Sequence, residues 1–387
     1  MLYLHIGFHK AGSTTLQTFV RDNTEALAAA GVVYPEIGRG RDAIAHHALG
    51  RGLKRRREPP SADTERLWRE VAELAGRESN VLISSEGLEP SDPAPLAQWL
   101  QGVPVKVIAY VRELPGRLVS IYGQSTKRGQ NTLDFDDFLT RELTLERTYT
   151  APKLKVWAEL FGAQNIRIRS TDPSCLEGGD IITDFLVALG LGPDARERLG
   201  LVGGGVQNVT PGWRTLEVLR SLNAEADWSD DDDVTGGEDA RSPGGSLLRA
   251  AQDAEASLGW GERGLYLSEE QIARAVKIDR EDIAEVEALG VDARLKPASA
   301  GAIPPRTFLP NISDIPAEAV TRFYREMLIA SARQVMLRPR RLRGRQPDEP
   351  PAVEPPAAAP LKAEEGRGWG PVGRWLRALV RWLRGAR

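Results

Sequence analysis

The stretch GFHKAGSTT, residues 7–15, has the residue types and spacing of a loop that binds a phosphate group. Its two glycines lie five residues apart, and the hydroxyl residues Ser13 and Thr14 follow directly. A strand that leads into such a loop and then into a helix turns backbone N–H groups and a positive helix end towards an anion. A Walker loop carries its lysine after the second glycine, whereas Lys10 lies inside this loop. The sequence therefore predicts a phosphate compound whose bridging oxygen meets Lys10, and argues against a magnesium-bound β,γ-phosphate chain.

A second stretch, YVRELPGRLVSIYGQ, offers a guanidinium and a hydroxyl group. Arg112 directly follows an apolar run at 105–111, and Ser120 comes eight residues later in a helix that Pro115 predicts to begin nearby. Together these two groups suit a phosphate monoester. They can converge on one anion only if the end of the strand folds back towards the helix.

Strand and helix patterns alternate around these stretches. The predicted strands are 1–6, 80–85, 105–111 and 165–170, and the predicted helices include 14–30, 63–76, 152–162, 180–192, 268–290 and 315–337. This alternation predicts an α/β fold, a P-loop-like three-layer sandwich with a central parallel sheet flanked by helices. Both candidate anion-binding stretches follow a strand, and α/β proteins bind ligands at the carboxyl ends of their strands.

In type, order and spacing, these pieces resemble the sulfotransferase family that uses 3′-phosphoadenosine 5′-phosphosulfate (PAPS) as its donor. In that family the first strand leads into a loop like P-K-[ST]-G-[ST]-T, here HKAGST, and a later strand ends in an arginine followed eight residues on by a serine. The likeness, to a bacterial branch similar to carbohydrate sulfotransferases, covers about residues 1–222 and continues weakly to 337. It implies PAPS as co-substrate and no metal. The donor contacts that it implies are His9, Lys10, Ala11, Gly12, Ser13, Thr14, Thr15, Arg112 and Ser120.

The sequence departs from the family pattern at two places. His9 stands where the family has proline before the loop lysine. The Arg-Lys-Gly segment that adds 3′-phosphate contacts in cytosolic members has no clear match in residues 203–218, so that contact is unassigned.

Sulfuryl transfer needs a base that takes the proton of the acceptor. Lys10 would stabilise the negative charge on the leaving oxygen. The favoured base is Glu86, which directly follows the predicted strand 80–85. Related carbohydrate sulfotransferases often use a glutamate. His46 and His47 are the alternative bases, or they line the acceptor pocket or cover a helix. His5 alternates within a strand and is expected to be structural.

The resemblance implies an acceptor hydroxyl or amine on a carbohydrate or glycolipid, and a lipid-linked or small alcohol acceptor stays open. The basic residues in 51–57 suit an anionic glycan, although such runs are more often solvated faces. Two other interpretations compete: a P-loop nucleotide kinase or NTPase, and a non-catalytic, membrane-recruited nucleotide-binding protein. Selective binding of adenosine 3′,5′-bisphosphate over AMP and ATP–magnesium would separate the three.

Composition bounds the class of protein. The 387 residues are 41% hydrophobic and 27% charged, which is ordinary for a globular chain, and one cysteine cannot form an internal disulfide. No signal peptide or spanning segment is visible, so we expect a cytoplasmic protein. Residues 1–337, the predicted sulfotransferase domain, carry a net charge of −10, which disfavours nucleic-acid binding. An acidic, glycine-rich stretch at 229–246 is predicted to be a loop or insertion.

The carboxyl-terminal segment is basic and amphipathic. An Arg-rich and then Pro-rich linker is predicted at 338–368, and a helix at 369–387. Apolar residues recur there at helical spacing, with arginines on the other side. The apolar positions are Val372, Trp375, Leu376, Leu379, Trp382 and Leu383, and the basic ones are Arg374, Arg377, Arg381 and Arg384. We expect this helix to lie on an anionic membrane surface, which places the enzyme on the inner face of the membrane, with docking on a protein as the alternative.

Overall fold

A computed structural model of the chain describes residues 1–8, 10–40, 44–53, 59–78, 80–204, 211–225 and 243–336, without the side chains of 243–247 and 331–336. The predictions for His9, for most of the loop 229–246 and for the segments 338–368 and 369–387 fall outside these residues. The chain divides into two compact units. The sheet unit comprises 1–122, 135–210 and 265–309, and the helical unit comprises 123–134, 211–264 and 310–387.

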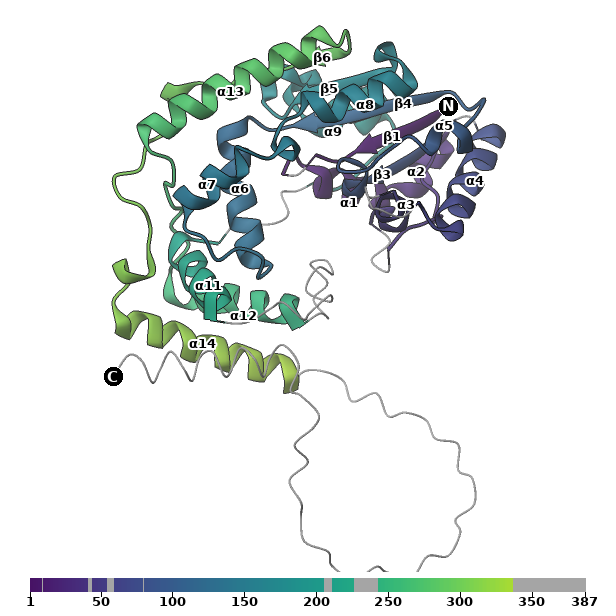
Figure 1. The fold of residues 1–387 in the computed structure, drawn as a ribbon. Coiled ribbons are helices and arrows are strands. Elements are labelled where there is room, and N and C mark those ends of the chain that lie inside the picture. Colours follow the sequence, from purple (N-terminus) through teal and green to yellow (C-terminus); the bar gives the residue numbers. More distant parts are fainter. Residues whose placement is uncertain are drawn as a thin grey trace, which may run out of the picture. The chain divides into compact units, whose positions relative to one another are not determined.

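The sheet unit is built on a parallel sheet of six strands in the order β2-β3-β1-β4-β5-β6 (Figure 1). These strands are β1 (Leu2–Ile6), β2 (Val32–Val33), β3 (Asn80–Ser85), β4 (Val105–Val111), β5 (Ile166–Ser170) and β6 (Asp292–Arg294). All five residues of β1 are buried although their side chains alternate between the two faces, so both faces of the sheet are covered. The α/β fold with a parallel sheet flanked by helices is therefore confirmed.

Because the sheet is parallel, the carboxyl ends of its central strands lie side by side. β1 pairs with β3, with Ile6 opposite Ser85, and with β4, with His5 opposite Ile108. The chain runs from β1 to β2 and β3 on one side and from β4 to β5 and β6 on the other. The loops after β1 and β4 thus flank a switch point, where α/β proteins bind ligands.

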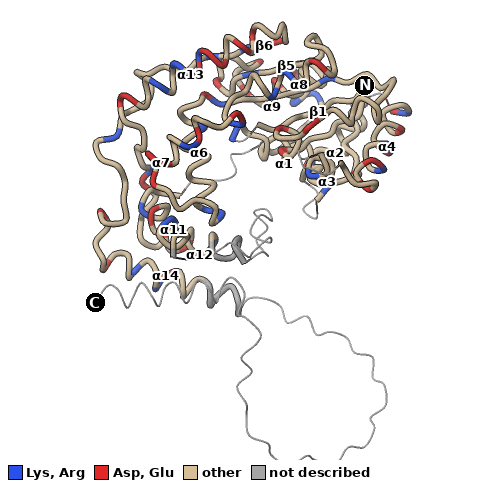
Figure 2. Tube along the Cα trace, viewed as in Figure 1, with Lys and Arg blue, Asp and Glu red and all other residues tan. Residues whose placement is uncertain are grey.

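Helices of the sheet unit pack on both sides of this sheet. They are α1 (Ser13–Asp22), α2 (Thr24–Ala29), α3 (His47–Gly52), α4 (Ala62–Arg77), α5 (Leu96–Trp99), α6 (Leu114–Lys127, whose last residues belong to the helical unit), α7 (Phe135–Glu142), α8 (Ala151–Phe161), α9 (Ile181–Ala188), α10 (Ala195–Arg198) and α13 (Glu269–Ala288). Helix α1 packs with α9, α8 packs with α13, and α4 packs on β3. Figure 2 shows acidic and basic residues interspersed along the exposed faces of α4 and α13. On α4 they form ion pairs one turn apart, such as Glu65 with Arg69.

Short 3₁₀ turns join these elements. They are η1 (Glu86–Leu88), η2 (Glu146–Thr148), η3 (Ala163–Asn165), η4 (Pro173–Cys175), η5 (Glu177–Gly179) and η7 (Ala300–Ala302). Ser85 Oγ accepts a hydrogen bond from Gly87 N at 3.1 Å, which starts η1 directly after β3.

The predicted helix 14–30 is in fact two helices, α1 and α2, which break at Asn23. Asn23 Oδ1 accepts a hydrogen bond from Val202 N at 3.0 Å, and Asn23 Nδ2 donates to Val202 O at 2.8 Å. This pair of bonds holds Asn23 at φ −119° and ψ 19°, which is not helical. The prediction of one continuous helix was wrong because a distant segment competes for Asn23.

A network of charges around the buried Arg169 ties the edge strand β6 to β5. Arg169 is 1% exposed and donates from Nη2 to both carboxylate oxygens of Asp292, at 2.7 and 2.9 Å. Its Nη1 donates to Asp292 O at 2.7 Å. Asp184 of α9 lies beside Arg169, with 3.9 Å between Nε and Oδ2, and accepts a hydrogen bond from Tyr110 Oη at 2.7 Å. The edge strand is thus held by paired charges as well as by its backbone.

The helical unit contains α11 (Trp213–Glu225), α12 (Pro243–Leu258), α14 (Ala317–Met336) and the turn η8 (Ile312–Asp314). Helix α12 packs along α14, and Trp260 stacks on Phe323 with ring centroids 4.9 Å apart. The start of α12 at Pro243 corrects the predicted loop 229–246, because 243–246 are helical and proline suits the first helical position. Among the helices in the described ranges, none is long and apolar enough to span a bilayer.

Candidate functional site

The loop between β1 and α1 has the backbone of an anion-binding turn. Lys10 has φ +63°, a left-handed conformation that is uncommon for a residue with a side chain, and Gly12 has φ +84°. Left-handed residues within a turn aim successive N–H groups into a concavity that attracts anions. Gly12 is the N-cap of the ten-residue helix α1, so its first turn has no side-chain cap. The half-buried Thr14 and Thr15 lie in that first turn.

Gly7 is required by close packing at the start of this loop. A Cβ atom at Gly7 would lie 2.6 Å from Ser13 Oγ and 3.1 Å from Glu86 Cγ. Gly7 N also donates to Ser85 O at 3.2 Å, which joins the loop to the end of β3. The half-buried Glu86 side chain therefore lies against the loop after β1, at Gly7. The sequence predicted that Glu86 and Lys10 lie at the carboxyl ends of strands of one sheet, and the strands that they follow, β3 and β1, are neighbours in the structure.

Arg112 and Ser120 meet as the spacing required. Arg112 Nη1 donates to Ser120 Oγ at 3.2 Å, and Nε donates to Glu113 Oε1 at 3.3 Å. The Arg112 side chain is 44% exposed, so its N–H groups are accessible to a ligand. Helix α6 begins two residues after Arg112, which turns the end of β4 back towards Ser120. A guanidinium after β4 and a hydroxyl group in α6 thus lie together, and β4 is the neighbour of β1, which leads into the loop with Lys10.

The histidines have different environments. His46 is fully buried, and its Nδ1 accepts from Ser84 N at 3.1 Å while Nε2 lies 3.0 Å from Pro35 O. Burial lowers the pKa of His46 to about 4. Because both ring nitrogens are engaged by backbone groups, the geometry does not support His46 as a base or as a pocket residue; it joins β3 to the segment before α3. His47 is half-buried at the start of α3.

His5 is structural, as the sequence predicted. Its Nδ1 lies 2.7 Å from Ser84 Oγ, which also accepts a hydrogen bond from Gln17 Nε2 at 3.1 Å. Burial lowers the pKa of His5 to about 4. The neutral imidazole thus belongs to a buried network between β1, β3 and α1.

Sequence reasoning missed a buried ion pair beside the loop. Lys153 of α8 pairs with Glu89, which follows η1, and its ammonium lies 5.2 Å from the centroid of the Phe8 ring. Burial lowers the pKa of Lys153, and the charge of Glu89 opposes that shift. The pair therefore connects the loop after β1, the turn after β3 and α8. Loss of one partner would leave an uncompensated buried charge.

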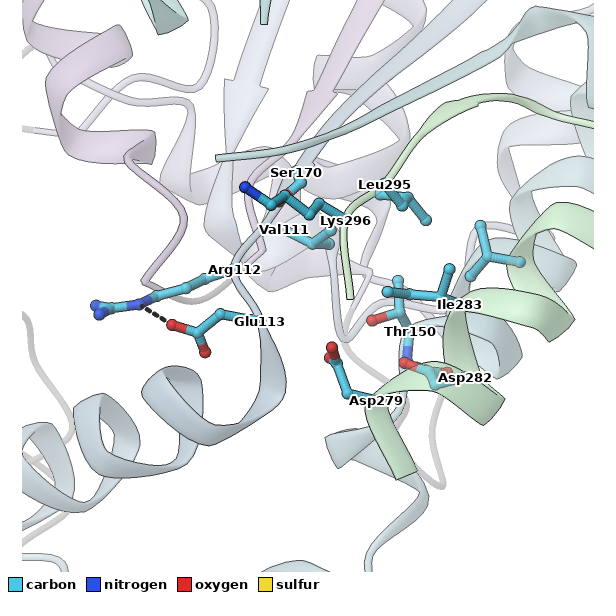
Figure 3. Close-up of a pocket in the computed structure, with 11 residues that line it drawn as sticks. Val111, Arg112, Glu113, Thr150, Ser170, Asp279, Asp282, Ile283, Leu295 and Lys296 are labelled. Atoms are coloured by element: carbon cyan, nitrogen blue, oxygen red, sulfur yellow. Dashed lines mark hydrogen bonds and ion pairs between the residues drawn. The ribbon is translucent and has the colours of Figure 1, made fainter. Parts of the chain in front are cut away.

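Sequence reasoning also missed a hollow beside Arg112 (Figure 3). Arg112 and Glu113 line it after β4, Lys296 lines it after β6, and Asp279 and Asp282 line it from α13. Asp279 lies far from Arg112 in the sequence, but it falls on the apolar stripe of α13, between Val276 and Ile283. An acid at such a position is a signal that could have marked it as a buried, hydrogen-bonded group. The hollow lies between the end of β4 and the end of β6.

The described residues form two candidate anion-binding groups, each of which follows one of two adjacent strands. One is the loop after β1 with Lys10 and the start of α1, and the other is Arg112 with Ser120 after β4. A carboxylate, Glu86, lies against the first. This arrangement suits a ligand with two separate anionic groups, and a proton transfer beside one of them.

Comparisons with known proteins give a distant structural likeness. No protein-family model matches the chain, and no curated protein matches it. Among solved structures, a sulfotransferase from Alicyclobacillus acidocaldarius matches with a TM-score of 0.38 and 13% sequence identity, over 75% of this chain and 96% of that one. At that distance the match carries no argument.

Proposed function

We propose that the protein is a PAPS-dependent sulfotransferase that moves a sulfuryl group to a hydroxyl or amine of a carbohydrate or glycolipid. The observation that carries the proposal is the 3.2 Å contact between Arg112 Nη1 and Ser120 Oγ at the end of β4. The neighbouring strand β1 leads into the loop in which Lys10 has a left-handed backbone conformation. A kinase or NTPase would need a lysine after Gly12, where this chain has Ser13.

The donor would be held at both of its anionic ends. In this proposal, Arg112 and Ser120 bind the 3′-phosphate, and the loop after β1 binds the 5′-phosphosulfate through backbone N–H groups and the hydroxyls of Thr14 and Thr15. The fit is supported by the absence of a side chain on the N-cap Gly12, because a Cβ-bearing residue with its own capping group would compete for those N–H groups. Ser13 is 3% exposed and its Oγ lies 3.5 Å from Phe8 O, so it shapes the loop.

The transfer is an in-line displacement at sulfur. An acceptor oxygen or nitrogen forms a bond to sulfur while the bond from sulfur to the 5′-phosphate oxygen breaks, and adenosine 3′,5′-bisphosphate leaves. Glu86 takes the proton of the acceptor, and Lys10 stabilises the negative charge on the leaving oxygen. The packing of Glu86 Cγ beside Gly7 supports this assignment, because it puts base and loop at one place.

Ligand-dependent thermal stability tests the proposal. A ligand that binds only the native state raises the melting temperature by mass action. We expect adenosine 3′,5′-bisphosphate to stabilise the protein more than AMP or ATP–magnesium at equal concentration. Greater stabilisation by ATP–magnesium would favour a kinase or NTPase, and equal stabilisation by all three nucleotides would favour a non-catalytic nucleotide-binding protein. No stabilisation by any of the three would contradict the proposal.

Arg112→Ala is expected to weaken binding of the bisphosphate and to leave AMP binding nearly unchanged. A hydrogen bond to a charged group contributes about 1.5–3 kcal/mol, so the bisphosphate should lose at least about tenfold in affinity. Calorimetric titration with both nucleotides measures the difference. Lys155→Ala, which removes an exposed cation of α8, is the matched control for net charge. Equal losses for the two nucleotides would contradict the role of Arg112.

The carboxyl-terminal segment 369–387 is proposed to recruit the enzyme to an anionic membrane surface. Each basic residue near such a surface contributes about 1 kcal/mol, and the tryptophans suit the interface. The full chain should float with vesicles that contain anionic lipid, and less so at high salt. Deletion of 369–387 should abolish flotation, whereas neutral vesicles serve as the control. A full chain that stays unbound at low salt would instead favour docking of this segment on a protein.

A further inference from the structure

One carboxylate on α13 bonds to two of the segments beside the hollow, the one that follows β4 and the one that follows β6. Asp279 Oδ1 accepts from Leu114 N at 2.8 Å, and Asp279 Oδ2 accepts from Ala298 N at 2.8 Å. Leu114 is the first residue of α6, two residues after Arg112, and Ala298 follows Lys296 by two. Figure 3 shows the Asp279 side chain reaching from α13 towards the hollow.

Asp279 is well placed to fix the start of α6. The first N–H groups of a helix lack partners within the helix, and a carboxylate there is favoured by the helix dipole. Asp279 is 6% exposed, and Leu114 is 1% exposed, so water does not readily replace this bond. Burial raises the pKa of Asp279, while its two backbone N–H partners and the charge of Arg117 favour the carboxylate. The bond therefore sets where α6 begins relative to the end of β4.

Helix α13 carries a second carboxylate that accepts hydrogen bonds from backbone N–H groups, in this case at the start of α8. Asp282 lies one turn further along α13 and accepts from Thr150 N at 2.8 and 2.9 Å and from Ala151 N at 2.9 Å. It thus caps α8, whereas Asp279 caps α6. Asp282 is 7% exposed, close to the value for Asp279. The chain therefore offers its own matched control.

We infer that Asp279 is a positioning residue for the anion site formed by Arg112 and Ser120. Arg112 lies before the first residue of α6 and Ser120 lies within α6, so their meeting at 3.2 Å depends on the turn between β4 and α6. Asp279 fixes that turn through its bond to Leu114 N, and its bond to Ala298 N fixes the segment that follows β6. The Asp279 carboxylate does not contact the ligand; it holds Arg112 and Ser120 in the positions in which they bind it. The inference rests on the proposed function, because the ligand of the site is taken to be a 3′-phosphate.

The test compares Asp279→Asn with Asp282→Asn in calorimetric titrations of adenosine 3′,5′-bisphosphate and AMP. An asparagine keeps one acceptor oxygen and turns its amide towards the other N–H group, so Asp279→Asn leaves Leu114 N or Ala298 N without its partner. Asp282→Asn removes the same charge but can keep Thr150 N and Ala151 N on one oxygen, because Asp282 Oδ1 accepts from both. We expect Asp279→Asn to lose about tenfold in the preference for the bisphosphate over AMP, comparable to the loss of one charged hydrogen bond. Asp282→Asn should keep the preference, because its carboxylate caps α8 and not α6.

A double-variant cycle shows whether Asp279 acts through Arg112. In the background of Arg112→Ala, Asp279→Asn should cause no further loss of the preference, because the two substitutions act on one interaction. If Asp279→Asn does not fold, Asp279→Glu takes its place, which keeps the charge and shifts it by one methylene. That variant should also lose preference for the bisphosphate.

The variants test the inference about Asp279, and the unsubstituted protein tests the proposed function. An unchanged preference in the folded Asp279 variant, or an equal loss in Asp282→Asn, would overturn the inference, and so would an additive loss in the double variant. The unsubstituted protein is the separate test of the proposed function. If it does not prefer the bisphosphate, the 3′-phosphate assignment fails first, and the inference about Asp279 fails with it.

Discussion

Lys10→Ala is expected to slow sulfuryl transfer by at least about a hundredfold, the loss typical for removal of one electrostatic donor at a developing negative charge. The loop after β1 puts Lys10 at the switch point of the sheet, where the leaving oxygen of the donor is proposed to lie. Single-turnover transfer from saturating PAPS to an acceptor glycan measures the chemical step. A variant that transfers at the unsubstituted rate would refute the mechanism.

Lys10→Gly is the control for backbone effects. Lys10 has φ +63°, a conformation that glycine adopts at no steric cost and alanine does not. The melting temperature of Lys10→Gly should therefore equal or exceed that of the unsubstituted protein. Its rate of transfer should be as low as that of Lys10→Ala. If Lys10→Gly regained activity, strain in the loop would explain the loss in Lys10→Ala, and the charge of Lys10 would not.

Glu86→Gln is expected to slow transfer by about 10² to 10⁴, because general-base catalysis supplies a factor of that size. The change removes the charge and keeps the shape beside Gly7 and Ser13. Affinity for adenosine 3′,5′-bisphosphate should stay unchanged, so the loss appears in kcat rather than in donor binding. Single-turnover rates and calorimetric titration together measure both.

Two further variants give this prediction its controls. His47→Gln should transfer at nearly the unsubstituted rate if Glu86 is the base. A slow His47→Gln enzyme combined with a fast Glu86→Gln enzyme would move the base to His47. His46→Gln should lower the melting temperature, since the buried His46 ring bridges Ser84 and Pro35 through both of its nitrogens.

Local pattern was enough to predict the four central strands of the sheet and the places of Lys10, Glu86 and Arg112 after three of them. The strands β1, β3, β4 and β5 appear within a residue or so of the predicted ranges, because each is an apolar run bounded by turn residues. Their parallel order followed from the alternation with helices, and so did the shared edge of Lys10, Glu86 and Arg112. The meeting of Arg112 with Ser120 was a condition of the prediction, and the turn into α6 satisfies it.

The features that the sequence did not predict depend on partners far along the chain. The edge strand β6 reads Asp-Ala-Arg, which has no apolar pattern, and its pairing with β5 is reinforced by Arg169. The break at Asn23 depends on Val202, 179 residues away. Asp279 falls on the apolar stripe of α13, but the sequence does not show that its partners are Leu114 and Ala298. Periodicity is a local property, so it carries no information about such contacts.

The late position of β6 has a consequence for the chain as it is synthesised. Arg169 and its counter-charge Asp292 are 123 residues apart, so a ribosome that adds about 5–20 residues per second needs roughly 6–25 s to supply the second after the first. During that interval β5 is an edge strand of the nascent sheet, and the Arg169 guanidinium has Asp184 beside it but lacks Asp292. An open edge is a template for pairing with another chain. Translation past residue 294 is therefore the step that covers β5, and chains that stop earlier expose the longer strand β5 in place of the three-residue strand β6.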